Sequence, residues 1–479
     1  MCGVIGIRGA HEAAKIAYLG LHALQHRGQE SAGIVAAQGS EHVAHCAMGL
    51  VQEAITDDHL TALAGTAAIG HVRYSTAGES MLRNAQPFSV RFHGGALAVA
   101  HNGNLTNAAQ LREELEGQGA IFQSTTDSEV LVHLLARESE GDLATNVVRA
   151  LTRVEGAYSI VILVNGVLIA ARDPLGFRPL SLGRLPEKSG AYVVASEPVA
   201  FDLIGAEAIR EIEPGEVLVI DEHGLTRAHV VTPSAAKQTR ACIFEHVYFA
   251  RPDSRLDGRS VYLARKALGA ALAREAPVDA DIVVPIPDSG AACAVGYAQA
   301  LGLPLELGLV RSHHVGRTFT EPEQAIRHFG VLLKLNPVRD ILAGRRVVLL
   351  DDSIVRGTTS RKIVKMVRDA GAREVHLRIA SAPVRWPCFY GIDTPNRSEL
   401  IAAHHSIEEI AHFTKADSIA YLSGSAMHAA VASVAAAQTK PSFCDACFSG
   451  NYPVPVCENL RRLPVMNEVV SGDDDRTLN

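Results

Sequence analysis

The chain has 479 residues, which is too long for one ordinary hydrophobic core and predicts two or three domains. A hydrophobic content of 47% with 20% charged residues is typical of a soluble globular protein, and the net charge of -7 excludes a general electrostatic attraction to nucleic acid. We find neither the ~20 consecutive apolar residues of a membrane span nor a signal peptide, and therefore expect a cytoplasmic protein. In that reducing compartment, eight cysteines favour thiol chemistry or metal ligation over disulfides.

Cys2 is the first residue with a candidate chemical role. If Met1 is removed, which the small side chain of Cys2 should permit, Cys2 carries a thiol and a free α-amino group together. An α-amino group has a pKa of about 7.7 to 8.0, so it can act as the base for the thiol. A cysteine at position 2 is more often incidental, so its interpretation depends on the motifs that follow.

Four short motifs follow Cys2 along the chain: LQHRGQESAGI at 24–34, HVRYSTAG at 71–78, HNGN at 101–104 and TTDSE at 125–129. Each motif alone is more typical of a turn or a surface ion pair. In this order and spacing, and together with MCGVIGI at the start, they resemble the class II, or N-terminal-nucleophile, glutamine amidotransferases.

This resemblance implies a glutaminase domain of the layered αββα fold and a role for each matched residue. Cys2 is the implied nucleophile, and Asn102 with the Gly103 N–H is the implied oxyanion hole. A guanidinium pairs bidentately with a carboxylate, and two fixed donors stabilise a tetrahedral intermediate, so the residue types suit this chemistry. Arg73 would bind the α-carboxylate of glutamine and Asp127 its α-ammonium; the implied glutamine-binding residues are Arg73, Asp127 and His71.

Short β-rich segments occupy the region from about 154 to 232 and resemble the second half of that glutaminase fold. We see no chemistry of their own in them. The polar, proline-marked sequence TPSAAKQT at 232–239 is the predicted domain boundary, so the first domain is predicted to span 2–232. The predicted strands are Tyr158–Val164, Val167–Ala171, Tyr192–Ala195 and Glu216–Ile220.

The second half is organised around VVLLDDSIVRGTTS at 347–360. Its four leading apolar residues predict a strand that is buried on both faces, as in a parallel sheet covered by helices. The loop after this strand precedes a helix whose buried face is marked by Ile363, Val364, Val367 and Ala370. The loop therefore lies at the carboxyl end of a parallel strand, where free N–H groups and the helix dipole favour a phosphate.

Asp351 and Asp352 suit ribose hydroxyls or a divalent cation beside that phosphate, although an isolated acidic pair after a strand is more often a helix cap. The motif lacks the GK[ST] ending of a P-loop. It resembles the phosphoribosylpyrophosphate (PRPP) motif of type I phosphoribosyltransferases, and most closely that of the glutamine PRPP amidotransferases. The residues that this resemblance places at PRPP are Asp351, Asp352, Ser353, Arg356, Gly357, Thr358, Thr359 and Ser360.

Two further segments of the second half match that family. DIVVPIPDSG at 281–290 reads as a strand closed by a turn, and in the family this turn is the pyrophosphate loop. The long, weakly periodic segment 311–335 suggests a lid and resembles the loop that closes over PRPP, with His314 and Leu332 departing from the usual Tyr and the common Arg. The additional PRPP-binding residues implied are Asp288, Ser289, Gly290 and Arg317. One Mg2+ per subunit is implied at Ser289, Asp351 and Asp352.

Four cysteines of the second half form a separate group. The CxxC of Cys444 and Cys447 is compatible with zinc, with redox chemistry or with neither. Together with Cys242 and Cys388 it matches the subgroup of the family that carries a [4Fe-4S] cluster, and zinc is the physical rival because four thiolates suit either. Three other cysteines have no partner in this scheme: Cys46, Cys293 and Cys457.

The resemblance covers the chain from Cys2 to about residue 466 and implies a phosphoribosyltransferase domain at 240–466, followed by an acidic tail at 467–479 that we expect to be disordered. The implied reaction transfers glutamine-derived ammonia to PRPP and yields 5-phosphoribosylamine, pyrophosphate and glutamate, the first step of purine synthesis. Feedback inhibition by purine nucleotides and a homotetramer are also implied, with no nucleic-acid or membrane partner.

Two alternatives remain. A different class II amidotransferase, such as a sugar-phosphate aminating enzyme, is disfavoured by DDSIVRGTTS. A catalytically silent iron-sulfur or nucleotide-sensing regulator on the same scaffold is disfavoured by the intact Cys2, Arg73, Asp127 and acidic pair.

Overall fold

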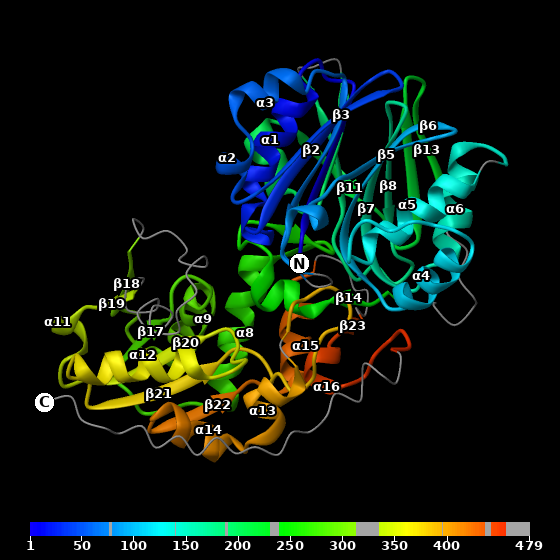
Figure 1. Cartoon of the computed structure of the whole chain (residues 1–479). Coiled ribbons are helices and arrows are strands. Elements are labelled where there is room, and N and C mark those ends of the chain that lie inside the picture. Colours follow the sequence, from blue (N-terminus) through cyan, green and yellow to red (C-terminus); the bar gives the residue numbers. More distant parts are fainter. Residues whose placement is uncertain are drawn as a thin grey trace, which may run out of the picture.

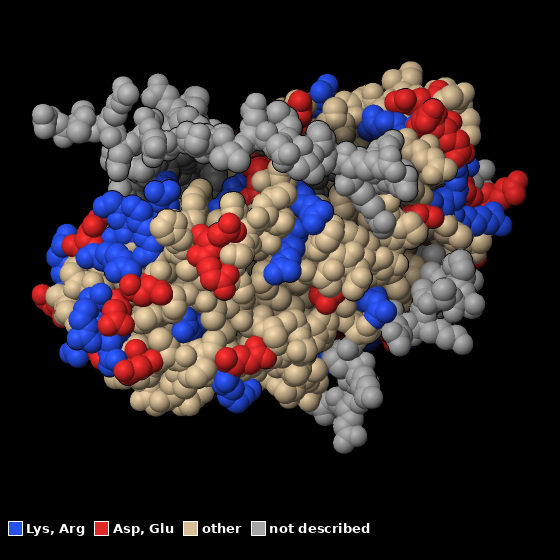
Figure 2. Space-filling view, turned by 90° about the horizontal axis from the view of Figure 1, so that it is seen from below, with Lys and Arg blue, Asp and Glu red and all other residues tan. Residues whose placement is uncertain are grey.

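The computed structural model describes residues 1–75, 79–138, 140–186, 190–229, 239–312, 335–394, 396–435 and 442–456. Two antiparallel sheets form the amino-terminal half, and a smaller parallel sheet lies in the carboxyl-terminal half (Figure 1). In the described part of the chain, none of the helices is long and apolar enough to cross a membrane. On the face seen in Figure 2, basic and acidic side chains are interspersed, so neither sign of charge dominates that surface.

The first sheet has seven antiparallel strands in the order β11-β9-β10-β1-β4-β2-β3. Strand β1 lies in its middle, with Ile5 opposite both Ala195 and Gly70. This register places the amino terminus at the end of a central strand, where neighbouring strands fix its position. The strands are β1 (Gly3–Arg8), β2 (Ser31–Gln38), β3 (Glu41–Met48), β4 (Ala67–Arg73), β9 (Ser181–Leu185), β10 (Ala191–Ala195) and β11 (Glu207–Glu211). The helices packed on its outer face are α1 (Ala13–Ala23), α2 (Val51–Ala54), α3 (Asp57–Ala62) and α7 (Val199–Ile204).

The second sheet has six antiparallel strands in the order β13-β12-β8-β7-β6-β5. Buried aliphatic side chains of both sheets, such as Val35 and Ile69 against Val161 and Leu168, form the core between them. The αββα fold and the four predicted strands are therefore confirmed. The strands are β5 (Phe88–Phe92), β6 (Gly95–Leu105), β7 (Gly156–Val164), β8 (Val167–Arg172), β12 (Glu216–Asp221) and β13 (Gly224–His229). The helices on its outer face are α4 (Ala108–Gly117), α5 (Ser128–Arg137) and α6 (Leu143–Thr152).

The sheet of the second half has four parallel strands in the order β17-β20-β21-β22. Pro285 pairs with Leu350, so the loops after β17 and β20 leave the same edge of the sheet. The predicted buried strand and the apolar helix face are confirmed. The strands are β17 (Ile282–Pro285), β20 (Arg346–Asp351), β21 (Glu374–Ile379) and β22 (Ser418–Tyr421). The helices around it are α8 (Val261–Glu275), α9 (Ala291–Leu301), α12 (Thr358–Asp369), α14 (Ile407–Thr414) and α15 (Gly424–Ser433).

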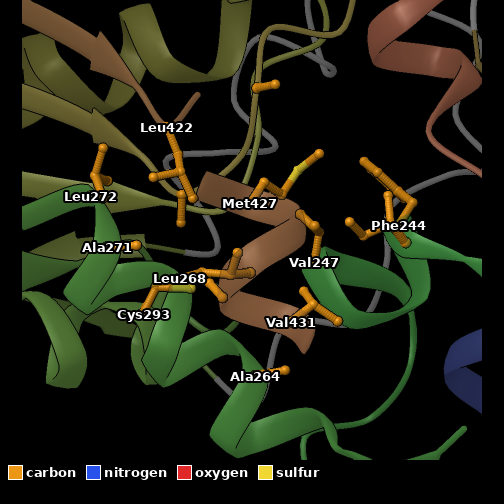
Figure 3. Close-up of a cluster of buried hydrophobic side chains, with 14 of the residues drawn as sticks. Phe244, Val247, Ala264, Leu268, Ala271, Leu272, Cys293, Leu422, Met427 and Val431 are labelled. Carbon is orange, nitrogen blue, oxygen red and sulfur yellow. The ribbon is translucent and has the colours of Figure 1, made fainter. Parts of the chain in front are cut away.

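A second core lies where α8, α9 and α15 meet η3 (Glu245–Phe249), a single turn of π-helix. Leu268 of α8 and Met427 of α15 point into it, together with Val247 of η3 (Figure 3). The remaining short elements are η1 (Gln25–Arg27), η2 (Leu82–Asn84), β14 (Ala241–Cys242), β15 (Arg255–Leu256), β16 (Arg259–Ser260), β18 (Leu309–Arg311), β19 (Leu335–Pro337), α11 (Arg339–Leu342), η4 (Arg397–Glu399), α13 (Ile401–His404), β23 (Phe443–Cys444) and α16 (Ala446–Ser449).

Three predictions fall largely or wholly outside the described residues: the domain boundary at 232–239, the lid at 311–335 with His314, Arg317 and Leu332, and the tail at 467–479. Cys457 is also outside them. The short strands β18 and β19, which flank the lid, pair with each other, with Arg311 opposite Leu335. The domain limits remain predictions.

Candidate active sites

The candidate nucleophile Cys2 is held by three contacts directly before strand β1. Its backbone N–H donates to Asn102 Oδ1 at 3.1 Å, its carbonyl accepts from Arg27 Nε at 3.0 Å, and its Sγ lies 3.5 Å from the Tyr74 carbonyl oxygen. The side chain is buried, and burial raises the pKa of the Cys2 thiol, although the amino terminus and Arg73 act in the opposite direction. A thiol in this setting requires a nearby base to become a thiolate.

Asn102 and Gly103 lie on β6, next to Cys2. Asn102 is fully buried and its Nδ2 has no hydrogen-bond partner among the described residues, although its Oδ1 is engaged by Cys2. Gly103 has a φ of +154°, and a Cβ added there would lie 2.0 Å from the Ala157 carbonyl oxygen, so no side chain fits. An uncommitted amide donor and a glycine backbone beside a thiol can receive the oxyanion of an acyl-transfer intermediate.

Two opposite charges face the same small cavity. Arg73 ends β4 and donates from Nη1 to Glu30 Oε2 at 3.3 Å and to Ser75 Oγ at 3.1 Å. Asp127 precedes α5, and its Oδ2 accepts from the Leu105 N–H at 2.9 Å. An amino acid carries both charges, so this cavity can orient one. Its lining residues are Cys2, Arg73, Tyr74, Gln86, His101, Gly103, Thr126, Asp127 and Ser128.

His71 lies behind this cavity and does not line it. Its ring is fully buried, its Nε2 is 3.1 Å from the His101 carbonyl oxygen, and burial lowers its pKa to about 3, so it is neutral. Its glutamine-binding role remains a prediction. Sequence reasoning missed the roles of Gln86, His101 and Ser128, whose side chains are linked through Ser128 Oγ, at 3.1 Å from Gln86 Nε2 and 2.9 Å from His101 Nδ1. Of these three residues, His101 carried a sequence signal, because it belongs to the HNGN motif.

The predicted phosphoribosyl site lies at the carboxyl ends of β17 and β20. Asp352 accepts from Ser353 Oγ at 2.5 Å and from the Ser289 hydroxyl, which joins the two loops. Burial raises the pKa of Asp351 well above its usual value, and the neighbouring carboxylate of Asp352 raises it further. Burial also raises the pKa of Asp352, against the hydrogen bonds from Ser289 and Ser353. A divalent cation would relieve this crowding of negative charge.

The acidic pair is not a helix cap. Helix α12 begins at Thr358, and its N-cap is Gly357, at a φ of +75°. This φ strains any residue with a side chain, and a Cβ would also lie 2.9 Å from Ile401 Cδ1, so the loop favours glycine here. Thr358, Thr359 and Ser360 form the first turn, whose N–H groups have no partner within a helix and can bind a phosphate.

The other predicted PRPP residues surround the same edge. Arg356 pairs with Glu399 at 2.9 Å, and Asp288 pairs with Arg311. Gly290 is the N-cap of α9, and a Cβ on it would lie 2.3 Å from the Leu350 carbonyl oxygen, so the loop after β17 packs against the backbone at the end of β20.

Four cysteines from distant parts of the chain gather near the junction of the two halves. Cys242 and Cys444 face each other in the parallel pair β14 and β23. Burial raises the pKa of the Cys447 thiol, and the thiols of Cys388, Cys242 and Cys444 raise it further. Among the described residues, no three His, Cys, Asp or Glu side chains converge closely enough to share a single metal ion.

A buried ion network joins Cys2 to the second half. Arg27 pairs with Glu197 and, from Nη2, with Glu245 of η3 at 2.8 Å, and Arg178 lies 3.3 Å from the same Glu245 oxygen. All four side chains are almost completely buried. Burial alone would raise the pKa of Glu197, but His26 and Arg27 hold it below its usual value.

Replacing Arg27 with Met is therefore expected to destabilise the fold by about 3 to 5 kcal/mol, because two buried carboxylates lose a partner. Thermal and urea unfolding would measure this loss. The matched control is Arg368→Met, which breaks the exposed 2.7 Å pair with Asp417 and should cost about 1 kcal/mol or less. Equal losses in the two variants would contradict a structural role for the network.

Two family models match the chain, one in each half. A glutamine amidotransferase domain matches residues 71–202, and a phosphoribosyl transferase domain matches residues 257–382. The fold and the two sites thus define a glutamine amidotransferase of class II joined to a phosphoribosyltransferase.

Full-length relatives specify the family. The chain is 48% identical over 470 residues to the amidophosphoribosyltransferase of Bacillus subtilis (strain 168), covering 98% of this chain and 97% of that protein. It is 49% identical over 476 residues to the chloroplastic amidophosphoribosyltransferase of Glycine max, covering 99% of this chain and 82% of that protein. The chain belongs to the amidophosphoribosyltransferase family.

Two solved structures support this family assignment. The B. subtilis glutamine PRPP amidotransferase complexed with ADP and GMP superposes with a TM-score of 0.87 at 48% identity, covering 95% of this chain and 98% of that one. A structure described as the allosteric regulatory enzyme of purine biosynthesis superposes with a TM-score of 0.89 at 47% identity, covering 96% and 97%.

Proposed function

We propose that this chain is an amidophosphoribosyltransferase, which transfers ammonia from glutamine to C1 of PRPP in the first step of purine synthesis. One observation carries the proposal: a buried thiol with an uncommitted amide donor and an acidic pair at the start of a phosphate-binding loop occur in a single chain. The products are 5-phosphoribosylamine, pyrophosphate and glutamate. Formation of phosphoribosylamine from glutamine and PRPP by the purified protein tests it.

In the glutaminase half, removal of Met1 would expose the α-amino group of Cys2 as the base for its thiol. The thiolate attacks the amide carbon of glutamine, and the oxyanion that forms is met by Asn102 Nδ2 and the Gly103 N–H. Arg73 and Asp127 hold the α-carboxylate and the α-ammonium. Collapse of the intermediate releases ammonia, and water hydrolyses the thioester to glutamate.

In the phosphoribosyl half, Asp351 and Asp352 bind the ribose hydroxyls, and the residues from Ser353 to Ser360 hold the 5-phosphate. Asp288, Ser289 and Gly290, with Arg317 of the lid, meet the pyrophosphate. Ser289, Asp351 and Asp352 would hold one Mg2+, whose charge would favour departure of pyrophosphate. The acidic pair fits this ion, because burial raises the pKa of both carboxyls, and their repulsion raises that of Asp351 further, despite the hydrogen bonds from Ser289 and Ser353.

We infer that ammonia released at Cys2 reaches C1 of PRPP through a closed path within the protein. Asp393 interacts electrostatically both with the amino terminus and with Arg356 of the predicted PRPP loop.

We further propose that Cys242, Cys388, Cys444 and Cys447 hold a [4Fe-4S] cluster. Cys242 and Cys444 are paired across β14 and β23, and the thiols of Cys388, Cys242 and Cys444 all act on the pKa of Cys447, which supports one shared group for the four. Four thiolates suit a [4Fe-4S] cluster, and zinc is the physical rival. The cluster would join segments about 200 residues apart and thereby stabilise the fold.

Protein purified without oxygen is accordingly expected to be brown and to contain roughly four irons per chain. Because the cluster is structural, exposure to air should bleach the visible absorbance and reduce the glutamine-dependent and ammonium-dependent activities together. Iron analysis, absorbance and both assays on one sample make the test. Stoichiometric zinc without iron would refute the cluster, and full activity after complete bleaching would refute its structural role.

The proposed function also includes regulation by purine nucleotides and assembly into an oligomer. One solved relative is complexed with ADP and GMP and another is described as allosteric, which supports purine nucleotides as feedback inhibitors of this chain. A homotetramer and a cytoplasmic location remain predictions; the relatives include bacterial and chloroplastic proteins. A catalytically silent regulator is the remaining alternative, and it requires that the purified protein produce no phosphoribosylamine.

A further inference from the structure

A segment of the second half, Cys388–Thr394, lies directly against the oxyanion hole of the first half. A Cβ added to Gly391 would lie 2.9 Å from both the Cα and the carbonyl carbon of Gly103, and 3.1 Å from the Gly103 oxygen. These are all backbone atoms, which cannot rotate away. One residue along β6, Asn104 Nδ2 donates to the Phe389 carbonyl oxygen at 2.9 Å. The two backbones are therefore in close contact at Gly103 and Gly391, and the Asn104 side chain hydrogen-bonds to the segment beside that contact.

The segment itself is firmly anchored. The Cys388 N–H donates to Thr394 Oγ1 at 2.6 Å, which closes the segment into a loop. Tyr390 is fully buried, its ring stacks on Phe177 of the glutaminase half at 4.4 Å between centroids, and its hydroxyl donates to the Val454 carbonyl oxygen at 2.7 Å. A loop held in this way can serve as a fixed wall for what packs on it.

Gly103 is consequently enclosed by backbone from both halves. Its missing side chain would meet the Ala157 carbonyl on β7, and Gly391 packs against it from the second half. The direction of the Gly103 N–H depends on the orientation of this peptide. An oxyanion-hole donor has to lie about 2.7 to 3.1 Å from the developing charge, and a displacement of ~1 Å in an active site can cost on the order of 100-fold in rate.

We propose that the Cys388–Thr394 segment, through Gly391 and the Phe389 carbonyl, is a positioning element of the glutaminase site. This inference rests on the proposed function, because it assumes that Gly103 serves the oxyanion. The glutaminase half is then incomplete without the second half, which supplies one wall of its oxyanion hole and no reacting group.

The direct test is Gly391→Ala in the full-length protein. Because Gly391 has a φ of +102°, the control must share that backbone strain: Gly371 has a φ of +98°, and a Cβ there meets only Ala343, at 3.4 Å. Gly391→Ala is expected to lower kcat for glutamine about 10-fold or more, towards the ~100- to 1,000-fold loss on removal of one oxyanion donor. KM for glutamine should stay within about 2-fold, because the ground state does not use the hole. Gly371→Ala should leave both constants unchanged.

A second readout separates positioning from general damage. Glutamate γ-semialdehyde, which forms a hemithioacetal at the thiol, should bind Gly391→Ala more weakly by about the same factor as kcat falls, whereas binding of the product glutamate should not change. Synthesis from ammonium should also be retained. Asn104→Ala removes the hydrogen bond to Phe389 without adding atoms, and it is also expected to lower kcat for glutamine. If Gly391→Ala does not fold, Asn104→Ala tests the positioning role in its place.

Unchanged kcat in a folded Gly391→Ala, or in Asn104→Ala when the former is unfolded, would overturn the inference. So would parallel losses of the glutamine-dependent and ammonium-dependent activities. Absence of PRPP-dependent glutamine hydrolysis in the unmodified protein would instead refute the proposed function.

Discussion

Replacing Cys2 with alanine is expected to abolish glutamine-dependent formation of 5-phosphoribosylamine while sparing synthesis from added ammonium. Among the described residues that line the cavity, Cys2 carries the one thiol, and it lies next to Asn102 and Gly103. The phosphoribosyl half needs only ammonia, whatever its source. Loss of a covalent nucleophile that acts with its base lowers kcat by roughly 10⁴- to 10⁶-fold.

The matched control for this prediction is Cys46→Ala. Cys46 is a free thiol of the same half, but its Sγ faces the Pro87 carbonyl oxygen at 3.8 Å and it does not line the cavity. Its replacement should leave glutamine-dependent synthesis unchanged. Substantial glutamine turnover by Cys2→Ala, measured as glutamate release, would show that another group is the nucleophile.

The second large effect is expected when Asp351 and Asp352 are both replaced by Asn. The shapes of the side chains are kept and two charges are lost. The rate of PRPP-dependent synthesis in the presence of Mg2+ should therefore fall about 100-fold or more, with either glutamine or ammonium as the nitrogen source. Basal glutamine hydrolysis should survive, because the glutaminase cavity contains neither residue.

Stability provides an internal check on this double variant. When the pKa of a carboxyl is raised in the folded state, the free energy of unfolding of the protein falls as the pH rises through that pKa. The pKa values of Asp351 and Asp352 are both raised. Near neutral pH the Asn variant should therefore unfold at the same or a higher temperature than the unmodified protein. Asp369→Asn, which breaks an exposed 2.7 Å pair with Lys365 on α12, is the matched control and should keep normal PRPP kinetics. Normal PRPP kinetics in the double variant would show that the acidic pair does not bind PRPP or its Mg2+.

The parts of the molecule that could be predicted from the sequence are those in which neighbouring residues carry the signal. The apolar run before Asp351 identified β20, and the spacing from Ile363 to Ala370 identified the buried face of α12, because both patterns repeat within one element. The resemblance to class II glutamine amidotransferases, which the order of the motifs carries, places Cys2, Asn102 and Arg73 in one site.

Contacts between distant residues could not be predicted in this way. Asn104 and Phe389 are 285 positions apart, and nothing in either local sequence indicates that the Asn104 side chain donates to the Phe389 carbonyl oxygen. The same holds for Arg27, which belongs to a recognised motif but whose partners Glu197 and Glu245 come from the far end of the first half and from the second. His71 presents a different difficulty: the resemblance implies a role at glutamine, and its buried ring contacts the His101 carbonyl oxygen, so that role remains a prediction.

The coupling of two reactions in one chain is tested most directly by product stoichiometry. The purified protein, supplied with glutamine, PRPP and Mg2+, should release glutamate and pyrophosphate in a ratio close to one, and omission of PRPP should reduce glutamate release to a low basal rate. Glutamate release at the full rate without PRPP would contradict the account. So would a failure to release pyrophosphate from PRPP with either glutamine or ammonium as the nitrogen source.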